Sequence, residues 1–426
     1  MAVQLAGLIL ISVICPVISV MAESLETLLL VHAASLLSTA RLLSETRPAP
    51  ASNLDTVRRS WHRRLAEHFQ SQRTVGMMSL FCVATGFALL GSLAGSSTLE
   101  TIQTTLRESY RPERADLLVG SGSILGSATC VLLFAGTAAS FGMFPLHGVL
   151  MNGFESAPAG ITGPTVLLQR LQASVVLWKT AIVAMPGFES TVLLLCVVFG
   201  AASCIGGSLL ACRTESLRGF TGNCWITWGG VVLIAAAAGL TAQTPQHHEA
   251  VWQFPSGLEI AAFSLLISAI AVVMLLTCDC WLTLENRGVD FAEDVTGLGK
   301  RHSAMAAAIG CALLTMCAIP PLPGFWCAVF ITGNAFLPGV ESTQGPSLVP
   351  DASILAAVVL LLLSLLVLSA RAVHFLSLLF LHEPIRRFEI AGRSIPALLS
   401  LTAVGLLLWA GLNVGTLFAW LHQLPL

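Results

Sequence analysis

The chain of 426 residues is 55% hydrophobic and 10% charged, with a net charge of −2 and a mean hydropathy of +0.83. Soluble domains contain about 25% charged residues, so this composition excludes a soluble globular protein and indicates an integral, multi-pass membrane protein. No basic surface suggests a nucleic-acid partner, and the lipid bilayer is the partner that the composition implies.

Apolar runs predict an all-α bundle of about eleven transmembrane helices, because roughly 20 apolar residues cross the hydrocarbon core. We expect one transmembrane domain over residues 1–426. The first run lacks the positively charged start of a signal peptide, which favours a true span and leaves a signal peptide as the alternative. The predicted spans are 3–21, 23–42, 75–95, 118–146, 164–184, 188–212, 222–242, 256–280, 303–335, 353–381 and 395–421.

The ninth predicted span is interrupted by the sequence IPPLPG at residues 319–324. Its three prolines remove backbone donors and block the helical hydrogen-bond ladder. At membrane depth, such a break survives only where protein or a water-filled cavity satisfies the freed backbone groups. Transporters use broken helices of this kind around their ion and substrate sites.

The basic residues predict the orientation of the chain. With a cytoplasmic N-terminus, 15 Lys and Arg side chains fall in cytoplasmic loops and three on the opposite side, in agreement with the positive-inside rule. Residues 43–74 are then predicted to form a basic cytoplasmic loop, which has room for a short amphipathic helix over 56–70. Residues 97–117 are predicted to be a surface helix or loop.

The twelve cysteines are scattered, and Cys278 and Cys280 form the one close pair. No second pair or histidine stands at ligand spacing, so we predict no metal site. The sequence contains no dinucleotide-binding glycine pattern and no cysteine run for an iron–sulfur cluster. We therefore predict no bound redox cofactor and no catalytic residue in this chain.

The second predicted span contains two groups that exchange protons. Glu26 lies near its start and His32 further along the same helix. A carboxylate that faces a bundle interior is suited to a proton relay, whereas one near the interface is simply solvated. His32 is either a hydrogen-bonded core imidazole or a member of a proton path. His147 follows Pro145 at the end of the fourth span. Its side chain either caps the broken region there or relays protons.

Cations within predicted spans are candidates for function, since a charge at bilayer depth costs at least about 2.5 kcal/mol. Arg170 lies in the fifth span, and Lys179 lies on the opposite face of that helix, beside Trp178. We expect Lys179 to snorkel to the interface. Arg170 acts as a fixed charge, since arginine does not release its proton. Arg371 and His374 lie one turn apart in the tenth span. They are interpreted either as a structural pair or as functional residues.

Five short motifs carry a resemblance to a known family. They are Leu25–Leu28, Phe144–His147 with Glu155–Thr162 after it, Glu293–Arg301, Ala318–Phe325 and Ser369–Arg371. In their order and spacing they resemble subunit N, the ND-two-like, antiporter-like subunit of respiratory complex I (NADH-quinone oxidoreductase).

The resemblance implies an antiporter-like fold with broken helices, in which the first three helices of the family are absent. It implies a membrane-arm subunit of a bacterial-type inner membrane that contributes to proton translocation. The other membrane-arm subunits would be its partners. NADH, FMN, iron–sulfur clusters and quinone would be bound by partner subunits.

The chain departs from the family at its lysines. Ser140 and Ala328 stand at two family lysine positions and Arg170 at a third, while Glu26 is retained. A proton relay needs groups that take and release protons, so a non-pumping structural subunit and a cation/proton antiporter component remain alternatives. The proton-path candidates are Glu26, His32, His147, Arg170, Arg371 and His374.

Overall fold

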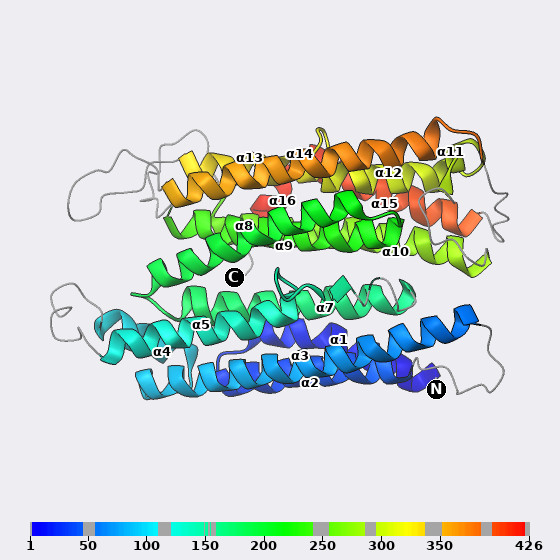
Figure 1. The fold of residues 1–426 in the computed structure, drawn as a ribbon. Helices are drawn as coiled ribbons and strands as arrows, with labels where there is room; N and C mark the ends of the chain where they lie inside the picture. The colour runs from blue at the N-terminus through cyan, green and yellow to red at the C-terminus, as the bar shows by residue number, and fades with distance from the viewer. Residues whose placement is uncertain are drawn as a thin grey trace. The chain divides into compact units, whose positions relative to one another are not determined.

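The computed structural model describes residues 2–45, 56–109, 121–148, 150–151, 154, 159–241, 255–285, 295–336, 352–384 and 394–421. These residues are almost entirely helical, which confirms the predicted all-α fold (Figure 1). Contacts divide the chain into two compact units. Unit 1 comprises residues 1–157 and 164–195, and unit 2 comprises 158–163 and 196–425. The expected single domain over 1–426 stays a prediction.

Seven described helices are long and apolar enough to cross a membrane, and an eighth span results if α15 and α16 are counted together. The other predicted spans correspond to α1, to α7 with η2, and to the pair α12 and α13. The seven helices are α2 (Leu25–Glu45), α3 (Thr56–Ala94), α5 (Ser121–Phe141), α8 (Glu189–Arg213), α9 (Leu217–Thr241), α10 (Gly257–Glu285) and α14 (Ala352–Phe380).

The segment predicted as a basic loop is helical where the structure describes it. Helix α3 begins at Thr56 and continues without interruption to Ala94, so residues 56–74 extend the third span instead of forming a separate amphipathic helix. No proline interrupts this stretch, and the backbone ladder therefore continues from the polar part into the apolar part. The surface segment after it contains α4 (Leu99–Ser109), as one of the two alternatives predicted.

In unit 1, α3 packs along α5 and α2, and α2 packs against α1 (Ala2–Met21). A short antiparallel bridge joins the loops at one end, where Leu25 N donates to Ser97 O and Leu99 N donates to Glu23 O, both at 2.9 Å. The hydroxyl of Ser24 accepts a hydrogen bond from Thr27 N at 3.2 Å and caps the start of α2. These contacts fix the start of the helix that carries His32.

In unit 2, α9 is buried along most of its length and packs against α10. The predicted break in the ninth span is confirmed, because α12 (Ser303–Met316) ends before it and α13 (Pro323–Phe336) begins at its last proline. Trp228 Nε1 donates to Met316 O at 2.9 Å and so satisfies a carbonyl that the break leaves free. A second break, between α15 (Ser394–Leu412) and α16 (Val414–Leu421), bends the chain by 83° and was not predicted.

Two glycines of the family motifs are required by close contacts. Gly297 has a φ of 71°, and a Cβ there would lie 2.4 Å from Pro384 N. Its N–H donates to Leu378 O at 2.9 Å, which joins the segment before α12 to the end of α14. At the break, a Cβ on Gly324 would lie 2.0 Å from Thr315 O. The glycine therefore lets the start of α13 approach the end of α12.

We expect Gly324→Ala to destabilise unit 2 by about 1–3 kcal/mol, because overpacking forces the backbone to shift. Thermal unfolding of the purified chain in detergent measures the effect. Gly405→Ala is the matched control, since a Cβ at Gly405 in α15 meets nothing within 4 Å. Equal stability of the two variants would contradict the tight contact at the break.

Candidate functional site

Arg170, on α7 (Ala159–Leu177), is buried in unit 1 with 1% of its surface exposed. Its Nε donates to Phe141 O at 3.2 Å, and its guanidinium carbon lies 4.8 Å from the centre of the Phe141 ring. Phe141 is the last residue of α5. The carbonyl end of a helix carries a partial negative charge, so the end of α5 and the aromatic face together hold this cation.

Lys179 is half-buried and lies in η2 (Trp178–Val183), a π-helical continuation of α7. Its Nζ donates to Val20 O and, at 2.8 Å, to Ala22 O. Val20 is in the last turn of α1, and Ala22 directly follows the last residue of that helix. The expected snorkelling to the interface stays a prediction. The lysine therefore caps α1, an arrangement that the single sequence does not reveal.

Arg371 and His374 have different surroundings. Arg371 NH2 donates to Thr214 O at 2.6 Å, just past the C-terminal end of α8, and its guanidinium lies 5.1 Å from the Phe375 ring centre. His374 is exposed, with its ring at the edge of Phe375. Of the two readings left open, these contacts support a structural role for Arg371.

A buried hydrogen-bonded cluster joins α2, α3 and α5 in unit 1. His32 Nε2 lies 3.2 Å from Ser79 Oγ, and Ser79 Oγ lies 2.6 Å from Ser140 Oγ and 2.7 Å from Gly136 O. The three side chains are at most 4% exposed. Ser140 therefore connects through Ser79 to a histidine. Its neighbour Phe141 holds Arg170.

The other two candidates lie elsewhere. Glu26 is exposed on the first turn of α2, so the structure does not bring it into the buried cluster. His147 is half-buried and stacks on Phe144 with ring centres 4.9 Å apart, and its Nδ1 lies 3.2 Å from Pro145 O. The imidazole thereby contacts the turn that follows α5. These contacts agree with the alternative in which His147 caps the end of the fourth span. No described residues form a cluster suited to a metal ion.

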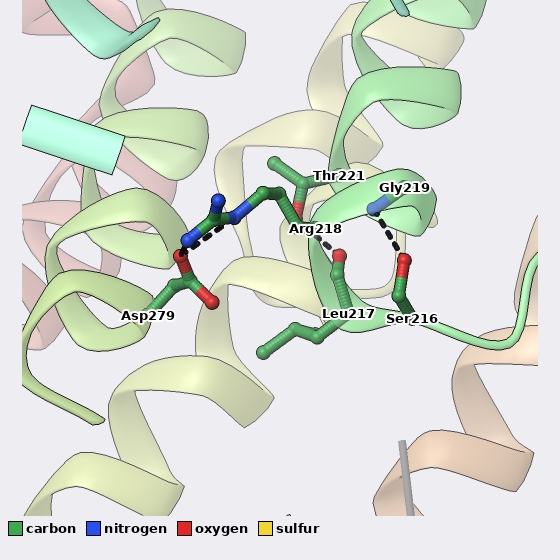
Figure 2. A network of polar contacts seen from close by, with 6 residues as sticks. All are labelled: Ser216, Leu217, Arg218, Gly219, Thr221 and Asp279. Carbon is green, nitrogen blue, oxygen red and sulfur yellow. Dashed lines mark hydrogen bonds and ion pairs between the residues drawn. The ribbon is translucent and has the colours of Figure 1, made fainter. Parts of the chain in front are cut away.

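The sequence analysis missed an ion pair between α9 and α10. Arg218 Nε and NH2 donate to Asp279 Oδ2 at 2.9 and 2.5 Å (Figure 2). The Asp279 side chain is 8% exposed and that of Arg218 20%. The same first turn of α9 is held by Ser216, whose Oγ accepts from Gly219 N at 3.0 Å. Asp279 lies between Cys278 and Cys280. An acidic residue inside an apolar run was the signal in the sequence that could have indicated a buried ion pair.

No protein-family profile matches the chain. It is 24% identical over 267 residues to NADH-quinone oxidoreductase subunit N of Methylobacterium nodulans, covering 63% of this chain and 50% of the relative. It is 25% identical over 242 residues to subunit N 1 of Herpetosiphon aurantiacus, covering 56% and 45%. The chain thus spans about half the length of these curated relatives.

This chain is similar to subunit N of NADH-quinone oxidoreductase. The predicted resemblance to subunit N is thereby confirmed. Solved structures show the same fold: a chain of the Mrp complex of a Dietzia species matches with a TM-score of 0.75 at 16% identity, over 98% of this chain and 76% of that one. A chain of respiratory complex I from Thermus thermophilus matches with a TM-score of 0.69 at 18% identity, over 98% and 79%. The chain therefore has the antiporter-like membrane fold.

We expect Asp279→Asn to lower the stability of unit 2 by about 1–3 kcal/mol, because it leaves the half-buried Arg218 without its charge partner. Unfolding of the chain in detergent measures the loss, and a double-mutant cycle with Arg218→Gln isolates the pair. Glu383→Gln is the matched control. Lys300 Nζ lies 2.5 Å from this exposed carboxylate and lowers its pKa. Exposed pairs contribute little, so equal losses at the two sites would contradict the assignment.

Proposed function

We propose that the chain is a membrane-arm subunit of a complex I-like NADH:quinone oxidoreductase and contributes to proton translocation coupled to electron transfer. It lies beside other membrane-arm subunits in a bacterial-type inner membrane. NADH, FMN, iron–sulfur clusters and quinone are bound by partner subunits, which carry out the redox chemistry. The similarity to subunit N supports this assignment.

The observation that carries proton translocation is the buried cluster of His32, Ser79 and Ser140. Family members place a lysine where Ser140 stands, and this chain has a buried imidazole two hydrogen bonds away. Histidine is a side chain that can take up and release a proton, whereas Arg170 is a fixed charge. His32 is therefore the proton-exchanging group, and Arg170 tunes its surroundings electrostatically. Glu26, exposed on α2, is the group that a neighbouring subunit would face.

A proton-flux measurement on the assembled complex tests this function. We expect His32→Gln to lower the number of protons translocated per NADH oxidised while the complex still assembles, because glutamine hydrogen-bonds but does not titrate. His382→Gln, an exposed histidine after α14, is the matched control and leaves the ratio unchanged. An unchanged ratio in His32→Gln would instead favour a structural, non-pumping subunit.

A cation/proton antiporter component is the second candidate, and the fold match to the Mrp complex favours it. Affinity purification of the tagged chain from its native membrane separates the two candidates. Copurified NADH-oxidising and iron–sulfur subunits support the oxidoreductase. Copurified antiporter subunits without redox partners support the alternative.

A further inference from the structure

The hydroxyl of Ser79 has three hydrogen-bond partners, and these determine where its protons lie. A serine hydroxyl has one proton to donate and two lone pairs that accept. Gly136 O lies 2.7 Å away and, as a carbonyl, only accepts. Ser79 therefore donates to Gly136 O, and its oxygen accepts from the two remaining partners.

Those partners are Ser140 Oγ at 2.6 Å and His32 Nε2 at 3.2 Å. Since the oxygen of Ser79 accepts from both, Ser140 donates its hydroxyl proton and His32 donates a proton from Nε2. A neutral imidazole has one N–H and one bare nitrogen. Neutral His32 is therefore the Nε2–H tautomer, and its Nδ1 has a free lone pair.

Nδ1 of His32 is fully buried and has no hydrogen-bond partner among the described residues. An unsatisfied buried acceptor costs about 1–3 kcal/mol, and a hydrogen bond from a water molecule to Nδ1 would remove that penalty. The lone pair of Nδ1 can therefore accept a proton inside unit 1. The other ring nitrogen, Nε2, is already hydrogen-bonded to Ser79.

Among the described side chains of α1, α2, α3 and α5, no buried carboxylate lies near His32 to pair with an imidazolium. Helices α1 and α5 carry no charged residue. On α2 and α3, the charged side chains Glu26, Arg41 and Arg73 are exposed. The other titratable side chains described on these four helices are the thiols of Cys15, Cys82 and Cys130. With no anion to retain an imidazolium, a proton bound at Nδ1 is readily released.

We propose that Nδ1 of His32 is a proton-binding site and that Ser79 is the positioning residue that keeps it open by holding the proton on Nε2. A hydronium ion delivers the proton: one of its O–H bonds breaks, a bond to the Nδ1 lone pair forms, and a neutral water molecule and an imidazolium result. The proton leaves from the same atom, which restores the neutral Nε2–H form. Ser79 and Ser140 orient the ring and do not carry the proton. For its role in translocation, the inference rests on the proposed function.

Solid-state NMR of the full chain in liposomes, with ¹⁵N-labelled histidine, tests the assignment. The His32 signals are identified as those missing from His32→Gln. In the unaltered chain we expect the neutral Nε2–H tautomer at high pH and, when the imidazole is protonated at low pH, the added proton on Nδ1. Ser79→Ala removes the acceptor at Nε2, so we expect a mixture of tautomers and a shifted titration midpoint.

Ser140→Ala is the matched control, because it removes a hydroxyl from the same cluster and leaves the bond between His32 and Ser79 in place. We expect it to keep the tautomer of the unaltered chain. An Nδ1–H tautomer in the unaltered chain, an unaltered tautomer in Ser79→Ala, or equal changes in both serine variants would overturn the proposal. If the tautomers agree but His32→Gln pumps normally in the complex, the proposed function fails and the proton-binding assignment stands.

Discussion

The three cations within the predicted spans depend on one interaction: each donates a hydrogen bond to carbonyl oxygens where another helix ends. Arg170 bonds to the end of α5, Lys179 to the end of α1, and Arg371 to Thr214 just past α8. A charge in an apolar interior is tolerated only with such partners, and the last carbonyls of a helix lack partners within the helix. Each contact satisfies both groups and fixes where a span stops.

This arrangement separates fixed charge from proton exchange. Arg170 and Arg371 are permanent cations that donate hydrogen bonds to backbone carbonyls at helix ends. Because arginine keeps its proton, these contacts stabilise the helix ends and do not transfer protons. His32 has a buried nitrogen without a partner among the described residues, and it reaches Ser140 through Ser79. Ser140, where the resemblance to subunit N places a lysine, is thus joined by a hydrogen-bond chain to an imidazole on a neighbouring helix.

Much of the fold was predictable because hydrophobicity and backbone chemistry are local. The spans follow from apolar run length, and the break between α12 and α13 follows from prolines that no helix accommodates. The bend between α15 and α16 escaped prediction, since Asn413 carries no comparable local signal. A short helix over 56–70 was within the prediction, but its continuity with the third span was not, because the charged residues suggested a loop between the two.

The sequence alone determined the class of protein, the positions of most spans, the likeness to subunit N and the short set of titratable residues, because these depend on composition and on motif order along the chain. The tertiary structure decided which of those residues meet. It separated Glu26 and His374 from the buried cluster, and it paired Arg218 with Asp279 across 61 positions of chain. It also placed Ser79 against His32. Helix rotation and packing set such contacts, and they depend on all neighbouring helices together.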